Sequence, residues 1–334
     1  MVCGRDHSVK PESPTSLFKT NVLVLFPLVL AVVLRVAGEM FPPDEVWGHM
    51  GHSIGLSAWP WLCLFAPFWA LLARYRTGRW TMPMFFALAV APLAGIPPMP
   101  DSGEGRPVLV ANVNAYMADR TDLQNAMADL QADVVIQVEA RVKEIPGMEA
   151  LAHNFDAQVS RPSHYTAAFC VEEAPCTSSI TEEFGYGAMV MPMAMVRIAD
   201  DVCVMGVHGP PPVPFNIEGL LPYMRKIADS IEAGRLRVDW GACRKGDPVI
   251  VAGDMNAVPG SWAIREFDGK GLRNMTAWRG VWTTSWPSGG DWINLPLMQL
   301  DHVYAGDIEV GDVRTVRLPG SDHQGLFFRI KSGR

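Results

Sequence analysis

Side chains that can hold a metal ion or move a proton stand where apolar stretches of the sequence begin or end. In chain order they are Asn112, Glu139, His208, Asp254, Asn256, Asp301, Asp322 and His323. The flanking stretches, such as VLVAN and VIVAGD, are typical of buried strands. Because strand ends in stacked sheets converge on one rim, we expect these side chains to meet there.

The residue types indicate hydrolysis assisted by a metal ion. Carboxylate and carboxamide oxygens suit Mg²⁺, with Mn²⁺ or Ca²⁺ as alternatives, and the cysteines lack the spacing of a zinc site. Histidines beside carboxylates can act as acid, base or phosphate contact. A single Gly-Asp-x-Asn turn or Asp-His pair is more often structural, so the prediction depends on their joint order.

The elements that must position these residues alternate between strands and helices. We expect strands at 107–113, 133–138, 187–198, 202–207, 249–252, 300–304 and 326–330, and helices at 119–130 and 217–231. Several neighbouring strands have no helix between them. This pattern favours an α/β fold of two packed mixed sheets flanked by helices over a doubly wound sheet.

The order Asn, Glu, His, Gly-Asp-x-Asn, Asp-His, Ser-Asp-His resembles the endonuclease/exonuclease/phosphatase superfamily, which has the deoxyribonuclease-like fold. The segments that carry the resemblance best are VIVAGDMNAVPGS, QLDHVY and LPGSDHQGLFF, and it extends over about residues 107–331. It implies a four-layer α/β/β/α sandwich that hydrolyses phosphoester bonds with a divalent metal. One departure is Val138, since Gln is common directly before the metal carboxylate in this family.

For the metal site, the resemblance implies that Glu139 is the principal carboxylate. Asn112 matches the neighbouring amide, and Asp322 matches a second carboxylate on the metal side.

For catalysis, the resemblance implies that Asp254 orients or deprotonates the attacking water, while Asn256 helps to hold the phosphate region. His323 matches the histidine that contacts the scissile phosphate, and Asp301 the acid that orients its imidazole. His208 matches a second histidine, on the leaving-group side.

The first hundred residues have a different composition. They contain 12 charged side chains, against 51 in residues 101–334. Three apolar runs, at 21–40, 54–73 and 80–99, are each about as long as a membrane-spanning helix. We therefore expect a membrane anchor of three transmembrane helices at 1–100, a linker at 101–106 and a catalytic domain at 107–334. A cleaved signal peptide is the alternative for the first run.

Basic residues set the expected orientation, because positively charged loops stay in the cytosol. The leader and the loop at 74–79 are basic, whereas the loop at 41–53 has no Lys or Arg. This pattern predicts a multi-pass inner-membrane protein whose catalytic domain is outside the cytosol. Four cysteines in that domain, Cys170, Cys176, Cys203 and Cys243, then either form one or two disulfides or stay buried free thiols.

The partners implied are a lipid bilayer and a phosphoester substrate, either nucleic acid or a phospholipid headgroup. A membrane tether favours the headgroup, and the general family pattern favours nucleic acid. The domain has 21 basic and 30 acidic residues, a balance that mildly disfavours long polyanions. The alternative of another class is a non-catalytic membrane protein that uses the fold as a binding platform.

Overall fold

The computed structural model describes the core of the catalytic region and a few residues before it. The described residues are 33, 36, 39–40, 53–58, 61, 103–113, 125–126, 128–139, 155–156, 166–171, 176–181, 185–186, 189–198, 201–211, 217–276, 282–288 and 296–331.

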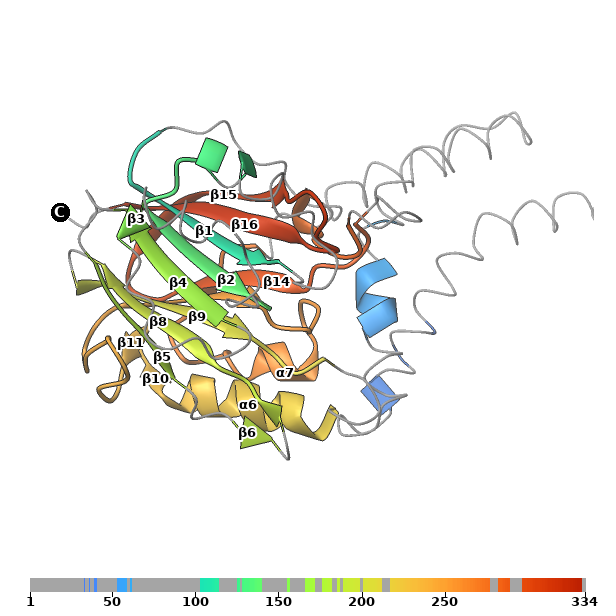
Figure 1. The fold of residues 1–334 in the computed structure, drawn as a ribbon. Helices are drawn as coiled ribbons and strands as arrows, with labels where there is room; N and C mark the ends of the chain where they lie inside the picture. Colours follow the sequence, from blue (N-terminus) through green and yellow to red (C-terminus); the bar gives the residue numbers. More distant parts are fainter. Residues whose placement is uncertain are drawn as a thin grey trace, which may run out of the picture.

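Two mixed six-stranded sheets form the core (Figure 1). The first sheet has the order β15 (Glu309–Arg317), β16 (Gln324–Lys331), β1 (Arg106–Asn112), β2 (Val134–Val138), β4 (Thr166–Val171), β3 (Phe155–Asp156). The second has the order β13 (Arg273–Asn274), β14 (Asp301–Ala305), β12 (Val249–Asp254), β9 (Cys203–His208), β8 (Met193–Ile198), β5 (Cys176–Thr181). Two short hairpins complete the strands: β6 (Gly185–Tyr186) with β7 (Met189–Val190), and β10 (Ile231–Glu232) with β11 (Arg235–Leu236).

Within each sheet, two strands that carry expected site residues run parallel. β1 pairs with β2, and β9 pairs with β12, while β16 and β14 run antiparallel to their neighbours. Parallel neighbours end at the same edge, so both sheets deliver their carboxyl ends to one side of the molecule.

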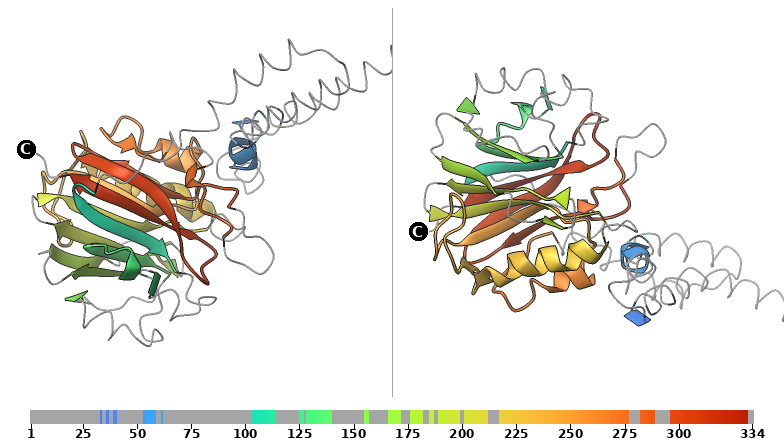
Figure 2. Two further views of the ribbon diagram at one scale, coloured as in Figure 1. Left: turned by 90° about the horizontal axis from the view of Figure 1, so that it is seen from above. Right: turned by 60° about the horizontal axis from the view of Figure 1, so that its bottom comes forward.

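Apolar side chains fill the space between the sheets and cover the second sheet. Val110, Ile136, Val204 and Phe328 belong to the cluster between the sheets, and all are at least 99% buried. On the other face of the second sheet lie α6 (Ile217–Asp229) and α7 (Trp262–Arg265). Figure 2 shows both helices on that face.

Most expected elements are confirmed. β1, β2, β9, β12, β14, β16 and α6 all lie within a few residues of their expected bounds, and the expected strand pair is β8 with β9. The long strand β15 was not expected. The two-sheet α/β core fits the expectation, whereas the expected helix at 119–130 lies largely outside the described residues.

The expectation of three transmembrane helices is wrong. Within the described part of the chain, no helix has both the length and the apolar character needed to cross a membrane. The runs 21–40 and 80–99 lie almost wholly outside that part. In the run 54–73, the described Trp61 contacts the catalytic region, since its indole N–H donates to the Leu297 carbonyl at 2.9 Å. The multi-pass inner-membrane location, with the domain outside the cytosol, is therefore also wrong, and a bilayer partner loses its support.

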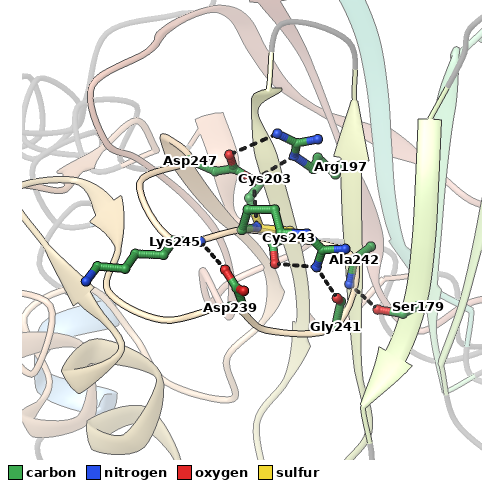
Figure 3. The surroundings of a disulfide bond; sticks show 10 residues. Ser179, Arg197, Cys203, Asp239, Gly241, Ala242, Cys243, Lys245 and Asp247 are labelled. Atoms are coloured by element: carbon green, nitrogen blue, oxygen red, sulfur yellow. Dashed lines mark hydrogen bonds and ion pairs between the residues drawn. A yellow bond between two sulfur atoms is a disulfide. The ribbon is translucent and has the colours of Figure 1, made fainter.

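The four cysteines of the catalytic region form two disulfides, Cys170–Cys176 and Cys203–Cys243. The second joins the start of β9 to the loop after β11 (Figure 3). That loop is also held by the Ala242 N–H, which donates to Ser179 Oγ at 2.6 Å. Cys203 is fully buried, so this crosslink anchors the strand that ends in His208.

Candidate active site

Three neighbouring strands of the second sheet place polar residues side by side. Asp254, at the end of β12, is opposite His208 on β9 and opposite Asp301 on β14. Adjacent strands lie about 4.8 Å apart, so this register brings the three side chains to one edge. All three are at least 95% buried, and most polar groups in such positions have hydrogen-bond partners.

The Gly-Asp sequence before this edge has a local steric reason. Gly253 has φ +138°, and a Cβ there would overlap the Val207 carbonyl of the neighbouring strand. Glycine therefore allows β9 and β12 to stay paired up to their last residues. Asn256 follows with φ +47°, a conformation that asparagine tolerates better than most residues.

The first sheet supplies the opposing groups. Asn112 ends β1 beside Val138 of β2, so Glu139 is the next residue at the same edge. Glu139 has φ +56°, an uncommon conformation for a residue with a long side chain. His323 directly precedes β16, whose first residues lie beside the end of β1.

Ser321 joins these two strand ends. Its hydroxyl donates to the Asn112 carbonyl at 2.7 Å and accepts the His323 N–H at 3.1 Å. The side chain is fully buried. It therefore sets the position of His323 relative to β1, a role that was not expected from the sequence.

Asp254 lies at the centre of the site. Its Oδ2 accepts from Asn112 Nδ2 at 2.9 Å, and its Oδ1 accepts the Asn256 N–H at 2.8 Å. The Nε2 atoms of His208 and His323 lie 3.9 and 3.7 Å from the same Oδ2. Burial raises the pKa of Asp254 to about 6, although both histidines oppose the rise. A carboxylate with that pKa can accept a proton near neutral pH.

The pair of His323 and Asp301 supplies a buried positive charge. The Nδ1–H of His323 donates to Asp301 Oδ2 at 2.8 Å. Burial lowers the pKa of His323, but the charges of Asp254 and Asp301 outweigh it and raise the value to about 10. His323 is therefore an imidazolium across the neutral range, with Nε2 directed to the Asp254 side.

A second pair lies on the other side of Asp254. His208 Nε2 is 3.0 Å from Glu139 Oε1. Burial lowers the pKa of His208, but the contact with Glu139 and the charge of Asp254 outweigh it, so the pKa is raised. Burial also raises the pKa of Glu139, and the contact with His208 outweighs it, so this pKa is lowered. Each member of the pair therefore favours the charged form of the other.

His302 and Ser285 hydrogen-bond to backbone groups next to the site. His302 is fully buried, and its Nε2 donates to the Ala257 carbonyl at 2.7 Å. Burial lowers the pKa of His302 to about 4, so it stays neutral. The Ser285 hydroxyl accepts the N–H groups of Leu300 and Asp301, both at 3.2 Å. The sequence alone does not show whether Asp301 or His302 of this Asp-His pair faces the site.

Two groups of side chains could hold a cation. Ligand atoms of Asp254, Asp301 and His323 lie within 4.8 Å of one another. In that group, however, the His323 imidazolium already lies against both carboxyl groups. The Glu139 side chain is 30% exposed, against 1% for Asp254, and Asn112 also hydrogen-bonds to it. The partly exposed Glu139 carboxylate, with the buried Asn112 amide beside it, is a set of hard donors that fits a divalent cation.

The structure thus brings together seven of the eight expected residues through direct contacts. They are Asn112, Glu139, His208, Asp254, Asn256, Asp301 and His323. The eighth, Asp322, is next to His323, and its charge contributes to raising the His323 pKa. Its backbone carbonyl accepts the Ser288 N–H at 2.7 Å. The catalytic and metal-binding roles of all eight residues stay predictions.

Comparisons with known proteins agree with this geometry. The model of the Endonuclease/Exonuclease/phosphatase family matches residues 109–323, and no curated protein matches the sequence. Among solved structures, D. rerio TDP2 complexed with single-strand DNA product is 15% identical, with a TM-score of 0.53, over 69% of this chain and 100% of that one. C. elegans TDP2 is 13% identical, with a TM-score of 0.51, over 99% of this chain and 98% of that one. At these identities the likeness shows the fold alone. The family match covers more than half of the sequence, so the chain belongs to the Endonuclease/Exonuclease/phosphatase family and is a phosphoester hydrolase.

Proposed function

We propose that residues 107–334 form a divalent-cation-dependent phosphodiesterase that cleaves nucleic acid by in-line attack of water. The observation that carries the proposal is the position of Asp254. One buried carboxylate lies between two histidines, and each histidine is paired with a further acid. This arrangement provides a proton acceptor with a histidine on each side of it.

Each side chain then has one task. Asp254, oriented by Asn112 and the Asn256 N–H, accepts a proton from the attacking water. His323, held by Asp301, stabilises the negative charge that builds up on the phosphoryl oxygens. His208 protonates the leaving oxygen.

Glu139 would hold the cation, with Asn112 and Asp322 beside it. When bound, a divalent cation such as Mg²⁺ supplies Lewis-acid charge that stabilises the leaving alkoxide. Asn256 donates its side-chain N–H to the Gly209 carbonyl at 2.8 Å and so fixes the turn around the phosphate region.

Nucleic acid is the substrate class that we favour. The solved D. rerio TDP2 was crystallised with a single-strand DNA product, and it shares this fold. The argument for a lipid headgroup depended on three membrane spans, and no helix among the described residues is long and apolar enough to be one. A non-catalytic platform is excluded by membership of a hydrolase family.

The test uses the full chain, a fluorescent single-stranded oligonucleotide and bis(4-nitrophenyl) phosphate, with Mg²⁺, Mn²⁺ or EDTA. We expect hydrolysis that needs the cation, and a fall of roughly 10²–10³-fold in rate for Glu139→Gln. Glu232→Gln is the matched control, since the Glu232 side chain is 77% exposed on β10. Hydrolysis that persists in EDTA and in Glu139→Gln would refute the proposal.

A further inference from the structure

Residues before the family domain contact both loops that carry the catalytic acids. One loop runs from Asp254 through Gly260 to α7, and the other leads through Leu297 into Asp301. The family match begins at residue 109. Any earlier residue at these loops therefore lies outside the residues that the family model matches.

Three contacts of different kinds make this connection. Glu39 Oε1 lies 2.7 Å from Arg265 Nη2 of α7. Leu56 packs over the Gly260 turn, where an added Cβ would lie 3.8 Å from Leu56 Cδ1. The Trp61 indole N–H donates to the Leu297 carbonyl at 2.9 Å. We call Glu39, residues 53–58 and Trp61 the N-terminal clamp, and Figure 1 shows residues 53–58 in blue beside the catalytic region.

The inner ends of the two loops are already joined to each other. The Met255 N–H donates to the Leu300 carbonyl at 2.9 Å, and His302 holds the Ala257 carbonyl. The clamp contacts the outer ends, where Gly260 and Leu297 are both exposed, and the Leu297 N–H also donates to the Trp286 carbonyl at 2.9 Å. Gly260 is four residues from Asn256, and Leu297 is four residues from Asp301, so a shift of either outer end reaches the catalytic side chains.

We propose that the N-terminal clamp is a positioning element that holds the two catalytic loops together from outside the family domain. The inference rests on the proposed function, because the loops matter through the acids that they carry. Displacing a reacting group by about 1 Å can cost on the order of 10²-fold in rate. The clamp therefore acts on turnover more than on substrate affinity.

The experiment compares two clamp variants of the full chain with two matched controls. Trp61→Phe keeps an aromatic side chain but removes the N–H donor, and Glu39→Gln removes the charge. The controls are Trp282→Phe, at an exposed tryptophan, and Asp307→Asn, which removes the charge from a more exposed ion pair, Asp307 with Arg235 at 2.6 Å. Hydrogen exchange by mass spectrometry is measured over residues 255–262 and 296–300, together with kcat and KM on bis(4-nitrophenyl) phosphate.

For Trp61→Phe we expect exchange in both loops to rise by roughly two- to tenfold, as loss of one hydrogen bond implies. We also expect kcat to fall by about three- to tenfold with KM unchanged, whereas the controls match the wild type. Unchanged exchange would refute the clamp, and faster exchange with unchanged kcat would refute its positioning role. A wild type without cation-dependent hydrolysis would refute the proposed function, whereas the exchange data would still show whether the loops depend on these contacts.

Discussion

The buried pair of Asp301 and His323 gives the sharpest test of the proposed chemistry. His323 Nδ1 and Asp301 Oδ2 are 2.8 Å apart, and both side chains are at least 94% buried. Burial lowers the pKa of His323 from its usual 6.5, but the charges of Asp254 and Asp301 raise it to about 10. The imidazolium should therefore persist well above neutral pH.

Asp301→Asn keeps the size and one acceptor oxygen but removes the charge. A hydrogen bond to a charged group contributes about 1.5–3 kcal/mol, against about 0.5–1.5 kcal/mol for a neutral pair. The difference of about 1–1.5 kcal/mol lowers the pKa of His323 by roughly one unit. The less firmly oriented imidazole should also reduce the rate at neutral pH by about ten- to a hundredfold.

The assay is the pH dependence of kcat/KM from about pH 6 to about pH 9.5 at saturating Mg²⁺. We expect the loss of activity that follows deprotonation of His323 to lie about one pH unit lower in Asp301→Asn than in the wild type. Asp307→Asn, on the exposed side chain of Asp307, serves as control. Identical alkaline limbs for wild type and Asp301→Asn, or a wild type that loses activity as pH rises through 6.5, would refute the role of the cationic His323.

Three further predictions concern the centre, the frame and the stability of the site. Because burial raises the pKa of Asp254 to about 6, activity should fall as pH drops through about 6, or somewhat lower with a cation bound, and Asp254→Asn should lower kcat by roughly 10²–10³-fold above that pH. Ser321→Ala removes the donor to the Asn112 carbonyl, so kcat should fall by about tenfold while the chain stays folded by circular dichroism. Replacing Cys203 and Cys243 by serine opens a loop of 40-residue separation, and urea unfolding should show a loss of about 4 kcal/mol; a loss below about 1 kcal/mol would contradict the structural role of this disulfide.

The site could be predicted from the sequence because its residues are at strand ends. Asn112, His208 and Asp254 each close a short apolar run, and parallel pairing brings such ends to one edge. The strand β15 escaped notice for a physical reason. Its sequence EVGDVRTVR is highly charged and is interrupted by a register shift between Gly311 and Arg314, so it shows no regular alternation.

Other features depend on contacts that no local pattern reveals. His302 and His323 both lie beside an acid in the sequence, yet only His323 points into the site, and His302 holds a backbone carbonyl instead. The apolar run at 54–73 has the length of a membrane span, but length and apolarity also suit a segment that packs on a protein surface, as Leu56 and Trp61 do. For residues 54–73, composition alone therefore could not decide between a membrane span and a segment that packs on the protein surface.

The charge balance of the site explains why a cation should matter for binding as well as for the chemical step. The four carboxyl groups of Glu139, Asp254, Asp301 and Asp322 outnumber the two histidines, His208 and His323. A phosphodiester anion would therefore approach a centre rich in acidic groups, and burial strengthens that repulsion because screening by water is reduced. A bound divalent cation would offset the excess of negative charge. It follows that loss of the Glu139 carboxylate should raise KM for an anionic substrate in addition to lowering kcat, whereas loss of Asp301 should act mainly on kcat.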